Sequence, residues 1–250
     1  MPFTLAHPAA ALPLRHRLPL PGLIAGTLAP DVVYYLPISM PLPTHSLAGT
    51  VTSDLTVGLL LLAALFGVAA DPLTALAPDG WRRRIREPEW DVRQLPRLAA
   101  AVVAGAITHV CWDSLVQRDG ALVARWPWLR STVIEPHKLY NVLGYLSSIG
   151  GLLALAFAAA GWYRRTPPGP PRPGLGRGPR RWVLGGTGVF VAFGVTHALT
   201  AYVRSGGYDL VRAALVGAIR WGAVAFAIYA VAWHLVARRA DYLSRLTTWR

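Results

Sequence analysis

The sequence has little charge, few acids and a single cysteine. Only 15% of its 250 residues are charged, and just 12 are Asp or Glu, whereas ordinary soluble proteins are about 25% charged. The lone Cys111 excludes an internal disulfide and a zinc site built from thiolates. Any bound metal must therefore take its ligands from histidines and carboxylates.

Several catalytic signatures are also missing. The chain has no Gly-x-Ser-x-Gly elbow, no Walker phosphate loop and no paired-glycine dinucleotide fingerprint. Serine hydrolase, nucleotide hydrolase and dehydrogenase chemistry therefore has no support. The net charge of +13 would indicate nucleic acid as a partner in a soluble protein. In a membrane protein it sets topology instead, so we expect no nucleic-acid partner.

Long apolar runs account for the missing charge. Hydrophobic residues make up 54% of the chain and its mean hydropathy is +0.39, which excludes disordered and fibrous classes. Four runs approach the ~20 residues that cross a bilayer core of ~30 Å, and a shorter run rich in Ala and Val follows the first. The five are 51–70, 98–112, 142–163, 182–203 and 211–237. They predict an all-α fold, a polytopic integral membrane helical bundle with about five transmembrane helices.

The N-terminal apolar segment, residues 18–36, is interrupted by three prolines and Asp31. We expect a short or re-entrant helix there rather than a span. Because Arg15 and Arg17 come late and no A-x-A site follows, we expect no signal peptide. The whole chain, 1–250, is expected to form one membrane domain. Its parts are a motif-bearing N-terminal segment (1–50), three helices with an outer loop (51–163), a flexible Pro/Gly/Arg linker (164–181), and two C-terminal helices with a basic tail (182–250).

Basic residues are unevenly divided between the two sides of the predicted bundle. With five spans, sixteen Lys and Arg fall on one side and eight on the other. The positive-inside rule places the richer side, with the C-terminus, in the cytoplasm. The N-terminal segment and the loop 113–141 then share the outer side of a cytoplasmic membrane.

Six polar residues interrupt apolar surroundings and are candidate metal ligands. Neutral imidazole and carboxylate suit zinc, with manganese and iron as neighbours. His109 and Asp113 are the most specific pair, because a spacing of four puts both on one face of a helix. An ionisable group near lipid is costly and is kept for a function. The six are His7, Asp31, His45, His109, Asp113 and His137.

Each candidate also has a structural interpretation. The His109–Asp113 pair is equally consistent with a hydrogen bond that ties helices together. His7 can be a solvated or interfacial side chain, and Asp31 can cap the next helical turn. His45 and His137 can be loop histidines at the membrane interface. What favours a shared site is that all six fall in segments that the charge count places on one face.

Several short elements occur in a fixed order along the chain: the opening Met1 to Thr4, the following His7-Pro8, the Gly26 to Asp31 and Thr44 to Ser46 elements, and His109 to Asp113. In these elements the sequence resembles a family of uncharacterised bacterial integral membrane proteins, domain of unknown function 4184. This family is distantly similar to bacterial membrane-bound metal-dependent hydrolases, which often have a second acid where this chain has Val33. The resemblance implies a site in the bacterial cytoplasmic membrane.

If a divalent metal, zinc or manganese, binds, we expect His45, His109 and Asp113 to form the core of the site. His7, Asp31 and His137 would complete it or hold a second ion, and Asp31 or Glu135 would act as general base. Membrane lipids are expected partners, and the nearby cations suit an amphiphilic or phosphate-bearing substrate. These cations are Arg130 and Lys138.

Two other functions are consistent with the sequence. A non-catalytic membrane scaffold would use the same His and Asp residues only to tie helices, and metal would not affect its stability. A transporter would line a path with polar residues of several spans, although five spans without a visible repeat argue against it. The path residues would be His109, His197, Arg220 and His234.

Overall fold

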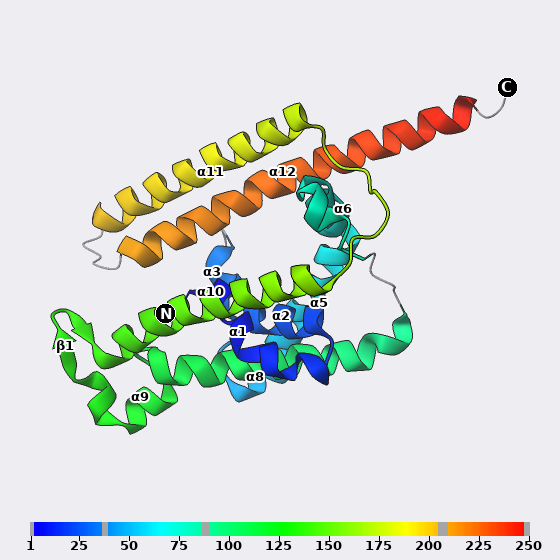
Figure 1. Ribbon diagram of the computed structural model, residues 1–250. Coiled ribbons are helices and arrows are strands. Elements are labelled where there is room, and N and C mark those ends of the chain that lie inside the picture. Colours follow the sequence, from blue (N-terminus) through cyan, green and yellow to red (C-terminus); the bar gives the residue numbers. More distant parts are fainter. Residues whose placement is uncertain (1–2, 37–39, 87–90, 205–209, 248–250) are drawn as a thin grey trace. The chain divides into compact units, whose positions relative to one another are not determined.

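The computed structural model describes residues 3–36, 40–86, 91–204 and 210–247, and the side chains of 237–247 are left out (Figure 1). Helices make up most of the described residues, and their one sheet is a two-stranded hairpin. This confirms the all-α prediction. The chain forms two compact units: unit 1 is Met1–Ala64 with Glu87–Pro167, and unit 2 is Leu65–Arg86 with Pro168–Arg250.

Five helical stretches are long and apolar enough to cross a membrane, which agrees with the sequence prediction. They are Ser53–Leu76, Val92–Arg125, Leu139–Arg165, Arg177–Arg204 and Leu210–Val236. The second was expected over 98–112, but its central helix α8 runs from Leu95 to Val116. Pro96 stands in the first turn of α8, where proline is tolerated because the first N–H groups of a helix have no partner in any case.

Short helices make up the N-terminal part of unit 1. They are η1 (Thr4–Ala6), α1 (Pro8–Ala11), η2 (Leu12–His16), α2 (Leu20–Leu28), η3 (Ala29–Asp31) and α3 (Val32–Tyr35), followed by α4 (Leu47–Val51) and α5 (Ser53–Ala64). The apolar segment 18–36 is thus a series of short helices, as its prolines predict.

Helices α2 and α8 approach each other at two glycines. A Cβ atom at Gly26 would collide with the carbonyl of Val102, and one at Gly105 would collide with the carbonyl of Leu23. Small residues allow two helix backbones to approach this closely. The close approach brings the end of α2, and with it Asp31, next to the polar end of α8.

A segment of short elements joins α8 to the long helix α10 (Leu139–Arg165). It contains α9 (Ala121–Arg125), η6 (Pro127–Arg130) and the hairpin of β1 (Thr132–Ile134) and β2 (His137–Lys138). On the other side of α8, the short helix η5 (Val92–Gln94) precedes it. The strands are antiparallel and pair Thr132 with Lys138. Val123, Leu129 and Tyr140 form a buried apolar cluster, which holds the loop against the start of α10.

Unit 2 contains the π-helix η4 (Leu65–Ala69), α6 (Ala70–Leu76), α7 (Asp79–Arg82), α11 (Arg177–Arg204) and α12 (Leu210–Thr247). Figure 1 shows α11 and α12 side by side, and they meet at Gly194 and Gly217, each of which lies against the backbone carbonyl of the other. The linker from 168 to 176 has no helix or strand, and its Gly169 carbonyl accepts a hydrogen bond from Arg83.

One histidine of unit 2 has a clear structural partner. Pro72 has no N–H to donate to the Val68 carbonyl four residues earlier, and His234 Nε2 lies 2.9 Å from that carbonyl oxygen. Since a carbonyl only accepts, the imidazole donates. Tyr229 likewise donates to the Pro72 carbonyl at 3.0 Å. His234 therefore ties α12 to the irregular part of the first span.

Candidate metal centre

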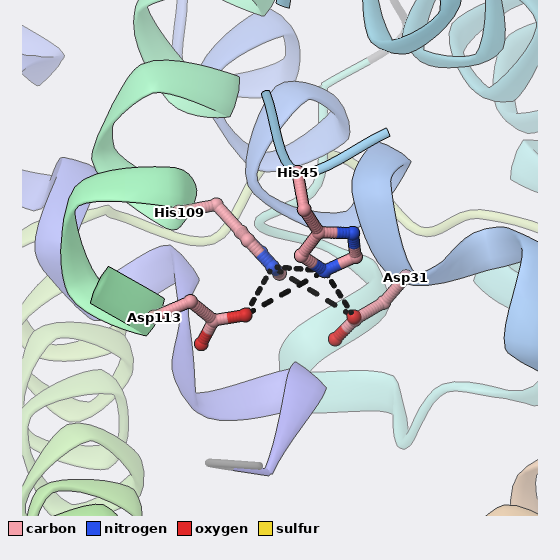
Figure 2. A group of neighbouring side chains, drawn as sticks. All are labelled: Asp31, His45, His109 and Asp113. Carbon is pink, nitrogen blue, oxygen red and sulfur yellow. Dashed lines mark hydrogen bonds and ion pairs between the residues drawn. The ribbon is translucent and has the colours of Figure 1, made fainter. Parts of the chain in front are cut away.

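Four of the six candidate residues meet in unit 1. Asp31 ends η3, His45 lies in the loop before α4, and His109 and Asp113 lie one turn apart on α8. One ligand atom from each of the four lies within 4.8 Å of all the others. Figure 2 shows the two imidazoles and two carboxylates pointing toward a common centre.

The spacing of these atoms matches metal coordination. His109 Nε2 lies 3.1 Å from Asp113 Oδ2, 3.3 Å from His45 Nε2 and 3.7 Å from Asp31 Oδ1. His45 Nε2 lies 3.2 Å from Asp31 Oδ1 and 3.5 Å from Asp113 Oδ2. Four ligands at about 2.1 Å from a zinc ion stand roughly 3.4 Å apart in a tetrahedron. The donor set and its spacing therefore fit a divalent cation.

Hydrogen bonding outside the centre determines which ring nitrogen faces it. His109 Nδ1 lies 2.7 Å from the Thr27 carbonyl oxygen, and because a carbonyl cannot donate, Nδ1 carries the proton. In a neutral ring, Nε2 then presents a lone pair to the centre, as in metal-bound histidines. That lone pair faces carboxylate oxygens, so the arrangement requires a cation between them or a second proton on the ring.

His7 lies beside Asp31, His45, His109 and Asp113, which we call the group of four. Its ring, like that of His109, turns a nitrogen toward a carboxylate. Its ring stacks on His109 with centroids 4.0 Å apart, and it is 3% exposed. His7 Nδ1 donates to the Thr4 carbonyl at 3.3 Å, which leaves Nε2 facing Asp113 Oδ1 at 3.2 Å. Asp113 thus presents one oxygen to the group of four and the other to His7. The interpretation of His7 as a solvated side chain does not hold.

Asp31 is oriented by a chain of hydroxyl groups. Thr4 Oγ1 donates to Asp31 Oδ2 at 2.6 Å, so the Tyr35 hydroxyl, 2.5 Å away, must donate to Thr4. Asp31 does not cap α3, since its side chain makes no capping bond. Burial alone would raise the pKa of Asp31, but hydrogen bonds from His45 and Thr4, together with the charge of His109 when that ring is protonated, hold the pKa below its ordinary value of 3.8. It is therefore a carboxylate at neutral pH.

The Thr-His-Ser element places His45. Thr44 Oγ1 lies 3.1 Å from His45 Nδ1, and Ser46 caps α4 by accepting from the Gly49 N–H at 2.9 Å. His45 itself has φ 59°, a left-handed conformation that is rare outside glycine. Strained backbone of this kind is characteristic of functional sites. Its side chain is 20% exposed, so the centre is accessible from the His45 side.

The structure places two other predicted residues elsewhere in unit 1. His137 lies in β2, with its ring against Tyr145. The side chain of Glu135 is 76% exposed and lies 3.8 Å from Lys138 Nζ. Neither belongs to the group of four. A ligand role for His137 and a general-base role for Glu135 stay predictions.

Sequence reasoning missed four polar residues around the centre. Thr4 and Tyr35 orient Asp31, and Gln117 donates to Asp113 Oδ2. Gln117 follows Asp113 by four residues, directly after the end of α8, so the spacing that identified His109 could also have identified Gln117. Asp54 is fully buried. Its position at the start of an apolar run was the only feature of the sequence that could have identified it.

The chain matches a known protein family. A family model described as Domain of unknown function (DUF4184) matches residues 1–231. No curated protein matches the chain, and no solved structure does. The match covers every residue of the centre.

Proposed function

The chain belongs to the DUF4184 family, and we propose that its group of four is the metal centre of a membrane-bound hydrolase. The observation that carries the proposal is the convergence of two imidazole nitrogens and two carboxylate oxygens, spaced 3.1 to 3.7 Å in the five pairs given above. The two carboxylates, and the His109 lone pair that faces Asp113, repel one another unless a cation or a proton lies between them.

The centre has the ligand chemistry of zinc or manganese. A bound divalent cation would lower the pKa of water and polarise a scissile bond. The ligands that would hold this cation are positioned in different ways. His109 and Asp113 are fixed on one helix, and Asp31 is held by Thr4. His45, partly exposed, borders the side from which a substrate would approach.

We propose an amphiphilic or phosphate-bearing substrate, with membrane lipids as partners. Trp126 and Trp128 of unit 1 are 40% and 57% exposed and stack with centroids 6.1 Å apart. Exposed tryptophans next to cationic side chains are typical of a membrane–water interface; here the cations are Arg130 and Lys138. By the charge count, this face and the centre would lie on the outer side of a cytoplasmic membrane, with the C-terminus inside.

The test is hydrolysis by protein reconstituted into vesicles of anionic phospholipid. We expect phosphate or headgroup release that requires added Zn²⁺ or Mn²⁺, stops with a chelator and falls at least about 100-fold in His45→Ala. His16→Ala is the matched control, because His16 is an exposed histidine of unit 1 outside the centre. Hydrolysis that survives chelation, or that both variants reduce alike, would contradict a metal-dependent reaction at this centre.

A further inference from the structure

Asp54 is a buried acid that the group of four does not include. It lies in the first turn of α5, is 0% exposed, and has no hydrogen-bond partner for either carboxylate oxygen in the described part of the chain. Other buried polar residues of unit 1 are partnered: Thr27 and Thr50 each donate to the carbonyl three residues earlier. Hydrogen bonding within the helices therefore does not explain why the Asp54 carboxylate is buried.

An unpartnered carboxylate is among the most costly groups to bury. The N-terminal end of α5 offers only a partial positive charge, which offsets a small part of that cost. Groups of this kind persist where a function uses them. A buried Asp54 carboxylate therefore needs a positive charge nearby to compensate it.

Its surroundings point to the metal centre. Asp54 interacts electrostatically with His45, His109 and Asp31, three of the four members. Helix α5 packs against η3, which carries Asp31, and against α8, which carries His109. Asp54 thus lies on the α5 side of the centre.

The charges there do not balance within the protein. Asp31 and Asp113 have histidines as ion-pair partners, and Asp54 adds a third carboxylate to the same neighbourhood. With all three acids ionised and the histidines neutral, the interior there would be strongly negative. A divalent cation would offset most of it.

We infer that Asp54 is a third acidic residue of this cation site, and that its counter-charge is the bound divalent cation rather than a group of the protein. The inference rests on the proposed metal centre. It implies two effects of opposite sign: the carboxylate destabilises the metal-free fold and strengthens metal binding.

The experiment compares Asp54→Asn and Asp54→Leu with the parent. The control is Asp71→Asn, which removes an exposed acid from the same continuous span. Zn²⁺ affinity is measured by competition with a chelator, and the melting temperature is measured after metal removal. Both Asp54 variants should bind Zn²⁺ at least about 10-fold more weakly and should melt at a higher temperature than the metal-free parent. The control should change neither quantity.

Failure of this inference differs from failure of the metal centre. Parent-like Zn²⁺ affinity in the Asp54 variants would overturn the role of Asp54 and leave the centre intact, provided that His109→Ala still abolishes binding. A parent that binds no Zn²⁺ would overturn both. If the Asp54 variants do not fold, or melt at a lower temperature when metal-free, Asp54 has a structural role and the inference is wrong.

Discussion

Thr4 determines which oxygen of Asp31 faces the centre. Its single hydroxyl proton goes to Asp31 Oδ2, which leaves Oδ1 directed toward His45 and His109. The Tyr35 hydroxyl fixes Thr4 in turn. Outer partners of this kind hold metal ligands in place and raise affinity.

Removing this hydroxyl should therefore weaken metal binding without removing a ligand. In Thr4→Val, which keeps the branched shape, we expect Zn²⁺ affinity to fall by about 10-fold, as measured by chelator competition. Thr4→Ser keeps the hydroxyl and should bind as the parent does. Equal affinity in the Val and Ser variants would show that Asp31 needs no orienting partner.

At this scale the sequence predicts local patterns and misses long-range ones. The i,i+4 spacing identified His109 and Asp113, and their 3.1 Å contact agrees with it. Thr4 is 27 residues from Asp31 along the chain, and no spacing rule connects them. The same limit applies to Asp54, whose meaning depends on helices that only the folded chain brings together.

At the scale of helices, the crossing of α2 and α8 positions the centre. The Thr27 carbonyl, which accepts from His109 at 2.7 Å, belongs to α2 and lies next to the contact glycine Gly26. Separating the two helices would move this carbonyl and Asp31 away from α8. The geometry of the centre thus depends on the direct contact between the backbones of α2 and α8 at Gly26 and Gly105.

A methyl group at this contact should damage both stability and metal binding. Gly26→Ala places a Cβ against the Val102 carbonyl, and such overpacking costs about 1–3 kcal/mol. The control is Gly150→Ala in α10, where a Cβ meets nothing within 4 Å, so it should be neutral or slightly stabilising. Thermal unfolding in detergent measures both. Parent-like melting of Gly26→Ala would contradict the close contact.

Hydropathy predicted the helices of this protein but not how they pack. The five spans and the broken segment 18–36 follow from apolar length and proline positions. The extension of α8 to Val116 was missed because Asp113 and Ser114 interrupt the apolar run there. The contact at Gly26 and Gly105 depends on two segments about 80 residues apart, which a single-segment pattern does not report.

At the scale of the whole molecule, the metal centre is assembled within one unit. Asp31, His45, His109 and Asp113 all lie in unit 1, and unit 2 uses His234 to tie a helix through the Val68 carbonyl. His197 has its ring against Phe193 of its own helix. These partners favour a local centre over a path lined by histidines of several spans.

The same atoms also allow the simplest rival, a scaffold in which protons replace the metal. A protonated His109 would donate to Asp113 and tie the helices without any ion. The heavy-atom positions are the same in both cases, so geometry does not distinguish the scaffold from the metal centre. The presence or absence of a bound metal ion does.

The most direct test is the metal content of detergent-purified protein by elemental mass spectrometry, beside a His109→Ala and Asp113→Ala double variant whose fold is checked by circular dichroism. We expect about one or more zinc or manganese ions per chain in the parent and none in the double variant. A folded parent without metal, even after reconstitution with both ions, would contradict it and leave a helix-tying His–Asp pair in a membrane scaffold.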